Sequence, residues 1–175
     1  MSHTIDSLFK NVILDEMRRI IDNAGALYLS YVCTATGVEL LGACQDAYPY
    51  EQEGKSRERF EKGLSTYMSK VRAGYGNPDF YGKNSKYDIY KHLRCGMAHV
   101  MRPQGKVAII GRGNAQQRGW SHLDIYISDQ VIFTAEDFFD DYKMAVELML
   151  KDIASSTDPK HTATFLPVAN MVQKP

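Results

Sequence analysis

The residues best suited to act together chemically lie in the stretch YKHLRCGMAHVMRP, residues 90–103. This stretch contains Arg94 and His99, with Gly96 between them and Pro103 just beyond. An imidazole titrates near neutrality and can accept or donate a proton, whereas a guanidinium can hold a phosphate through two parallel hydrogen bonds. Together the two groups would suffice for metal-free cleavage of RNA, in which the ribose 2′-hydroxyl is the internal nucleophile.

The spacing of Arg94 and His99 leaves a structural role open. On a regular helix their separation in the sequence corresponds to a rotation of about 140°, so the two side chains do not stack as a pair four residues apart would. A shared cleft therefore needs converging side chains, a distorted helix end or a second subunit. Alternatively, both cations bond the carbonyl groups at the C-terminus of their helix, where positive charge is favoured. The residues alone favour this second reading.

Four helices are predicted around this pair from apolar residues that recur at intervals of three and four. They span residues 5–21, about 57–71 after an N-cap at Ser56, about 86–100 before Pro103, and about 135–153 after a capping box of Thr134 and Asp137.

A further helix is predicted over residues 24–44, the longest apolar segment of the chain. We expect it to be buried and to pack antiparallel to the first helix. The segment is long enough to raise a membrane span, but it contains Glu39, several hydroxyl groups and three glycines, so we expect no membrane association.

A small β insertion is expected at about residues 106–133. KVAII and QVIF are short runs rich in β-branched residues, and HLDIYIS alternates with period two. We therefore predict an antiparallel hairpin or meander, with GRGNAQQRG as the loop between its first two strands. This loop lacks the full glycine pattern of a phosphate-binding turn. Residues 1–153 are then one domain, and residues 154–175, which lack periodicity, are a flexible tail.

Composition and cysteine usage narrow the class of protein. Lys plus Arg and Asp plus Glu are equal at 21 each, so overall charge predicts no attraction to nucleic acids or membranes. Cys33, Cys44 and Cys95 have no metal-ligand spacing, and we expect Cys33 and Cys44 to lie in the core. Carboxylates near helix starts are explained by the helix dipole. We therefore expect a cytoplasmic protein without a disulfide framework, metal or cofactor.

Local charge is more informative than the total. Eight basic residues lie between Lys83 and Arg118 against one acid, Asp88, whereas residues 135–153 carry six acids against two lysines. The basic stretch, interleaved with Tyr87, Tyr90 and Trp120, could follow a phosphate backbone and stack bases. Alternatively the charges cluster by chance, or the basic stretch pairs with the acidic helix of a neighbouring subunit.

The motif RCGMAH, residues 94–99, resembles the R-x4-H signature of the HEPN superfamily. These are small helical-bundle proteins found as RNase toxins, partners of nucleotidyltransferases and accessory domains. The resemblance covers roughly residues 5–153 and implies a mainly α, up-and-down helical bundle, with the β insertion as an embellishment. It also implies a homodimer that brings both motifs into one cleft, with RNA, an antitoxin or a nucleotidyltransferase as partners.

In active members of that superfamily the histidine serves in acid–base steps and the arginine steadies the scissile phosphate, which makes Arg94 and His99 the candidate catalytic residues. Catalytic members usually carry Asn, Asp or His directly after the arginine, whereas this chain has Cys95. Two functions therefore remain open. One is RNA binding or metal-independent endoribonuclease activity, and the other is a non-catalytic interaction module of a defence, stress or toxin–antitoxin system.

Overall fold

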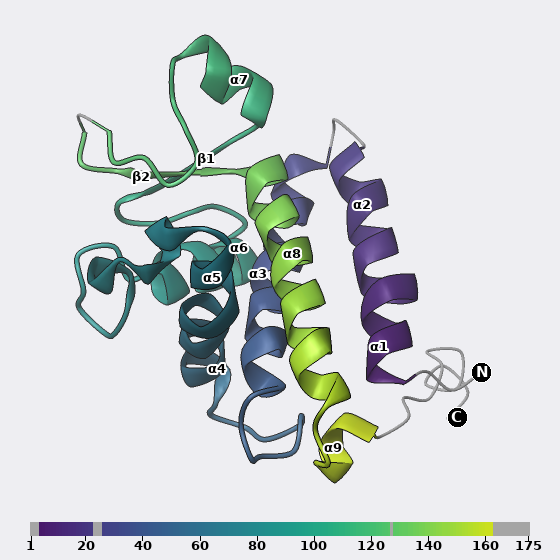
Figure 1. Cartoon of the computed structure of the whole chain (residues 1–175). Coiled ribbons are helices and arrows are strands. Elements are labelled where there is room, and N and C mark those ends of the chain that lie inside the picture. Colours follow the sequence, from purple (N-terminus) through teal and green to yellow (C-terminus); the bar gives the residue numbers. More distant parts are fainter. Residues whose placement is uncertain (1–3, 23–25, 127, 163–175) are drawn as a thin grey trace, which may run out of the picture.

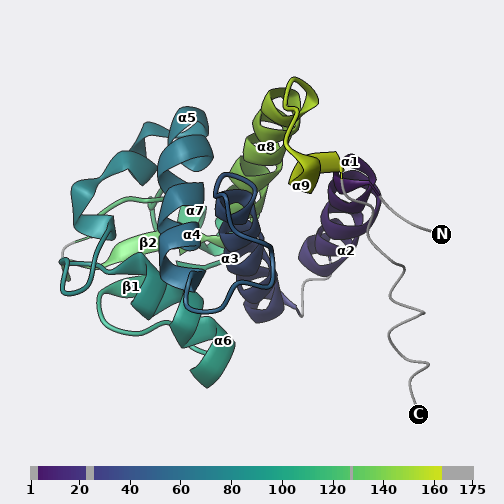
Figure 2. The ribbon, with the colours of Figure 1, turned by 90° about the horizontal axis from the view of Figure 1, so that it is seen from below.

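Helices make up most of the structure, a computed structural model that describes residues 4–22, 26–126 and 128–162 (Figure 1). The N-terminal helical arm consists of α1 (Ile5–Leu8), η1 (Phe9–Leu14) and α2 (Asp15–Asp22). It is followed by α3 (Leu27–Ala43), and both lie beside the long α8 (Ala135–Ala154) (Figures 1 and 2). The predicted mainly α class is confirmed. No helix within the described ranges is long and apolar enough to cross a membrane.

The other face of α3 is covered by a second helical rod, formed by α4 (Ser56–Gly63), η2 (Leu64–Met68) and α5 (Ser69–Val71). Helix α3 and this second rod approach each other closely at glycine residues. A Cβ atom on Gly42 would lie 1.7 Å from the Arg59 carbonyl oxygen, and one on Gly63 would lie 2.1 Å from that of Val38. Large aromatic side chains fill the core on this side, among them Tyr31, Tyr67, Tyr142, Phe60 and Phe138.

Short elements connect this rod to the sheet. They are η3 (Ala73–Gly76), η4 (Pro78–Phe80), η5 (Tyr90–Cys95) and α6 (Gly96–Val100). The last two form the helix predicted at about residues 86–100, which begins only at Ile89. Because η5 and α6 both pack against α3, the arginine–histidine motif lies at the side of the central helix.

The sheet differs from the prediction. Strands β1 (Val107–Ile110) and β2 (Val131–Thr134) are parallel, with Val107 opposite Val131, so the predicted antiparallel hairpin is wrong. Parallel strands need a crossover, and the segment predicted as a hairpin loop instead forms the helix α7 (Arg112–Gln117) within that crossover. Within the described residues of the predicted middle strand, an isolated antiparallel bridge joins Ile125 to Val131, and the Leu123 amide donates to the Ile132 carbonyl at 2.7 Å.

The chain after α8 remains attached to the bundle for several residues. Helix α9 (Pro159–Thr162) lies at the end of α3, where the Lys160 ammonium group pairs with Asp46 at 3.0 Å. The flexible tail predicted from residue 154 therefore differs from the structure as far as residue 162. Its remaining part, residues 163–175, lies outside the described residues.

Candidate functional site

The motif helix has wide turns and an abrupt end. In η5 the Gly96 amide donates to the Lys91 carbonyl, a π-helical bond that spans five residues. Beyond α6 the chain reverses at Met101, which adopts a left-handed conformation with φ of 54°. The Arg102 amide then donates to the Gly96 carbonyl at 3.3 Å, and the Gln104 amide to the His92 carbonyl at 2.9 Å. Backbone amides, not the cationic side chains of the motif, thus satisfy these carbonyl groups.

Glycine is required inside the motif for the same reason. A Cβ atom on Gly96 would lie 2.7 Å from the Arg102 carbonyl oxygen, so any larger residue would push the returning chain away. Met97, the next residue, is fully buried in the core. The central positions of RCGMAH therefore hold the helix end in place.

Arg94 turns toward α3. Its Nη2 atom lies 2.8 Å from Glu39 Oε2, and the two side chains are only 18% and 20% exposed. Its guanidinium carbon also lies 5.9 Å from the centre of the Tyr90 ring. Glu39 is the only charged residue of α3. Since an isolated charge beside an apolar surface is costly, Arg94 compensates Glu39 and is itself oriented by it.

His99, in contrast, is exposed on the last turn of α6. Within the described residues no hydrogen bond or ion pair involves its imidazole ring or joins it to Arg94. The two exposed neighbours, Val100 and Met101, are apolar and 48% and 57% accessible. One chain alone therefore presents His99 to solvent and Arg94 to Glu39, and it does not bring the two groups together.

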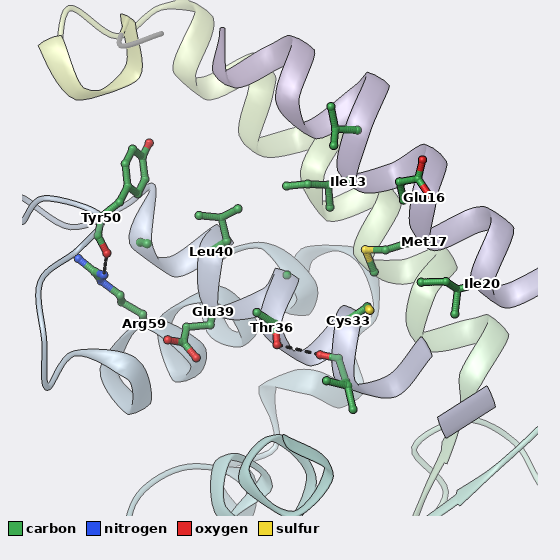
Figure 3. A pocket seen from close by; sticks show the side chains of 14 residues that line it. Ile13, Glu16, Met17, Ile20, Cys33, Thr36, Glu39, Leu40, Tyr50 and Arg59 are labelled. Atoms are coloured by element: carbon green, nitrogen blue, oxygen red, sulfur yellow. Dashed lines mark hydrogen bonds between the residues drawn. The ribbon is translucent and has the colours of Figure 1, made fainter. Parts of the chain in front are cut away.

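A groove lies on the other side of Glu39, between the N-terminal arm and α3 (Figure 3). Its volume is about 550 Å³, and apolar side chains make up most of its walls: Val12, Ile13, Met17, Ile20, Val32 and Leu40. Glu39 lines this groove as well as pairing with Arg94, so the motif and the groove share a residue.

The cysteines divide between the core and this groove. Cys44 is buried as expected, and burial raises the pKa of its thiol to about 11. Cys33 differs from the expectation because it is only half-buried and lines the groove. Partial burial raises the pKa of the Cys33 thiol as well, which makes it a poor nucleophile.

The basic stretch is partly neutralised within the chain. Arg112 pairs with Asp137 at 2.9 Å and with Asp140 at 2.7 Å, both on α8. Lys86 and Lys106 share Asp129. The basic segment therefore meets the acidic helix of its own chain. Within the described part of the chain, the exposed residues Lys83, Lys91 and Arg102 have no ion-pair partner.

The aromatic residues of this stretch are placed differently from one another. Tyr87 is fully buried and cannot stack on a base. Tyr90 is half-buried under the Arg57 guanidinium, which lies 4.5 Å from its ring. The Trp120 ring contacts the exposed Tyr126 ring, with their centres 4.7 Å apart. Of the three aromatic residues that could stack bases, Tyr87 is therefore excluded.

A second polar cluster surrounds His122, which sequence reasoning did not single out. Its Nδ1 atom accepts a hydrogen bond from the Thr134 amide at 2.9 Å, and its Nε2 atom lies 2.7 Å from the Tyr75 hydroxyl. Burial lowers the pKa of His122 to about 3. A neutral imidazole in this tautomer donates to Tyr75 and joins β2 to η3, which is a structural arrangement.

Glu39 and the groove were also not predicted as parts of a site. The signal for Glu39 was present, because a lone carboxylate in an otherwise apolar helix must find a cation. Which cation it finds depends on the packing of η5 against α3. The groove has no comparable signal, since its walls come from segments that read equally well as ordinary core helices.

Within the described residues no three His, Cys, Asp or Glu side chains lie together as a metal site would require. No protein-family model, curated protein or solved structure matches the chain. The structure thus defines a mainly helical protein with a two-stranded parallel sheet, and its HEPN-like character stays a prediction that rests on the motif.

Proposed function

We propose that the protein acts on RNA as a homodimer and cleaves the ribose–phosphate backbone without a metal ion, with His99 in acid–base steps and Arg94 at the phosphate. The observation that supports this function is the exposure of His99 on α6, in the same motif as Arg94, whose guanidinium pairs with Glu39. A histidine with no internal partner is free to exchange protons with a substrate.

The homodimer is needed because a single chain separates the two groups. Arg94 points to α3, whereas His99 lies at the exposed helix end with apolar neighbours Val100 and Met101. If α6 of a second chain packs on this end, His99 of one chain can approach Arg94 of the other. Lys91 and Arg102, both exposed and close in sequence to the motif, would attract the phosphate backbone.

The alternative is a non-catalytic interaction module. It is favoured by the ion pair of Arg94 with Glu39, because a phosphate would have to compete with a carboxylate that already holds this guanidinium. In this function His99 is a surface residue and Arg94 stabilises the contact between η5 and α3.

Cleavage of RNA in the presence of EDTA distinguishes the two functions. The wild-type chain should cleave, and His99→Ala should lose about 10²- to 10⁴-fold in rate, the usual share of general acid–base catalysis. His99→Gln is the matched variant, since it keeps a hydrogen-bonding side chain but cannot carry the proton. It should be as inactive as His99→Ala. Because His99 is exposed, both variants should keep the circular dichroism spectrum and melting temperature of the wild type.

Two results would overturn the nuclease proposal. One is a wild-type chain that neither binds nor cleaves RNA, and the other is cleavage that persists unchanged in His99→Ala. Either result would leave the interaction module as the function that the structure supports.

A further inference from the structure

The groove between the N-terminal arm and α3 is an apolar surface that the described chain leaves open. Ile13, Ile20, Val32 and Leu40 line it and are each only partly covered (Figure 3). Partly exposed apolar walls of this extent gain free energy when another apolar segment covers them.

One end of this groove lies beside α9, the last segment of the chain that the structure describes. The Lys160 ammonium group donates to the carbonyl oxygen of Ala43 and to that of Asp46, and it lies 4.9 Å from the centre of the Tyr50 ring. Ala43 and Tyr50 both line the groove. Helix α9 therefore anchors the chain beside the groove's end.

The anchor is completed by a second contact. His161 Nε2 lies 2.7 Å from the Cys44 carbonyl oxygen, at the C-terminus of α3. Lys160 and His161 are both fixed to the end of α3, so the chain after Thr162 starts within reach of the groove, although His161 itself lines a second pocket between α1 and α8.

The sequence continues from this point as ATFLPVANMVQKP, residues 163–175. The segment is largely apolar and contains no acid, and its only charged side chain is Lys174. The groove, in turn, carries two carboxylates, Glu16 and Glu39. Glu16 and Glu39 already pair with Arg19 and Arg94, and Arg59 also lines the groove, so the complementarity lies in the apolar composition.

Length is also sufficient. From Ala43 to Val32 the groove follows α3 for about 17 Å, at about 1.5 Å per helical residue. An extended chain covers about 3.3 Å per residue, so about six residues already span this distance.

We propose that residues 163–175 dock into the groove between the N-terminal arm and α3 of their own chain, with Phe165 and Leu166 against its apolar walls. Because residues 163–175 are joined to α9, they should bind the groove more strongly than a free peptide of the same sequence. A short linker gives an effective concentration in the millimolar range. Cys33, on the wall of the groove, is covered when the segment is bound.

Alkylation of Cys33 tests the docking. The rate is measured by mass spectrometry of peptides after treatment with a maleimide, at one pH, in the full chain and in the full chain carrying Phe165→Ser and Leu166→Ser. A groove occupied about nine-tenths of the time protects Cys33 about tenfold, so the double variant should react about tenfold faster. Cys95, which is also half-buried but lies outside the groove, is the internal control and should react equally in both.

Two further variants sharpen the test. Gln173→Ser, a polar change in the same segment, should leave Cys33 protected. A chain that lacks residues 163–175 should react like the double variant, and a synthetic peptide of residues 163–175 at millimolar concentration should restore protection.

Equal rates in the full chain and the double variant would overturn the proposal. Protection that increases with protein concentration and survives removal of residues 163–175 would also overturn it, because a second copy would then cover the groove. None of these readouts involves RNA, so the docking is tested independently of the proposed nuclease function.

Discussion

At the scale of single residues, several charged and polar side chains form contacts that bring distant parts of the chain together. Arg94 on η5 pairs with Glu39 on α3, and Arg72 pairs with Asp141 at 2.6 Å. His122 is held between the Thr134 amide and the Tyr75 hydroxyl. Of these groups, His122 makes stability depend on pH, because burial lowers its pKa.

His122 supplies the clearest case. Burial lowers the pKa of His122 to about 3, whereas a histidine in the unfolded chain titrates near 6.5. Between these values the unfolded chain binds one more proton than the folded chain. Stability is therefore full above about pH 6.5 and falls as pH decreases, by up to about 1.4 kcal/mol per unit. Urea unfolding at about pH 7.5 and about pH 5.5 should show a loss of about 1 kcal/mol.

The matched variant is His122→Asn, whose amide oxygen can still accept from Thr134 but does not titrate. It should be less stable at neutral pH, and this loss of stability between the two pH values should vanish. Three aspartates also have lowered pKa values, namely Asp46, Asp88 and Asp137. Their contribution to stability is lost only at more acidic pH. A pH dependence that persists unchanged in His122→Asn would exclude His122 as its source.

At the scale of elements, close packing of α3 on α4 places the rest of the site. Gly42 and Gly63 allow the two helices to approach until their backbones touch. Because α3 is fixed in this way, Glu39, three residues before Gly42, reaches Arg94, and α3 also forms one wall of the groove.

The glycines of this contact should not tolerate a methyl group. Gly42→Ala places a Cβ atom 1.7 Å from the Arg59 carbonyl oxygen, which only a shift of the helices can relieve. We expect a loss of about 3 kcal/mol in the free energy of unfolding, measured in urea. Gly113→Ala in α7 is the control, because nothing lies within 4 Å of that position. It should be neutral or stabilising by up to about 1 kcal/mol. A neutral Gly42→Ala would contradict the close approach of α3 and α4.

At the scale of the whole molecule, acidic and basic residues are equal in number, and some of them form ion pairs with each other within the chain. The acidic helix α8 holds Arg112 of the basic stretch, and Asp129 holds Lys86 and Lys106. What remains for a partner are exposed cations near the motif, beside the apolar end of α6. This combination of apolar and basic surface suits a dimer that binds a polyanion.

The predicted homodimer can be tested at that end of α6. Val100→Glu with Met101→Glu should keep the fold, since both side chains are exposed, but should weaken a dimer through repulsion and loss of apolar contact. Sedimentation equilibrium should show a dissociation constant raised by at least about tenfold, which is about 1.4 kcal/mol. Met144→Glu is the control, because Met144 is 45% exposed on α8. An unchanged dimer in the double variant, or a wild-type chain that is monomeric, would contradict the proposed α6 interface.

Much of the helical framework could be predicted because it depends on local patterns. Apolar residues such as Phe138, Tyr142 and Met149 recur at helical spacing, and all three are buried on one face of α8. The β insertion could not be predicted in the same way. Short runs such as VAII and VIFT indicate strands but not their direction, and α7 lies in a predicted loop, GRGNAQQRG, that contains three glycines.

The sequence by itself determined the five longer helical segments, their buried faces and the position of Arg94 and His99 on one of them, because these follow from spacing along the chain, whereas the short helices α7 and α9 were not predicted. Only the tertiary structure decided that Arg94 pairs with Glu39 while His99 stays exposed, and that the N-terminal arm and α3 leave a groove open. The reason is physical: the partner of a charge and the cover of an apolar face are set by which helices meet, and glycine contacts such as Gly42 with Arg59 decide that meeting.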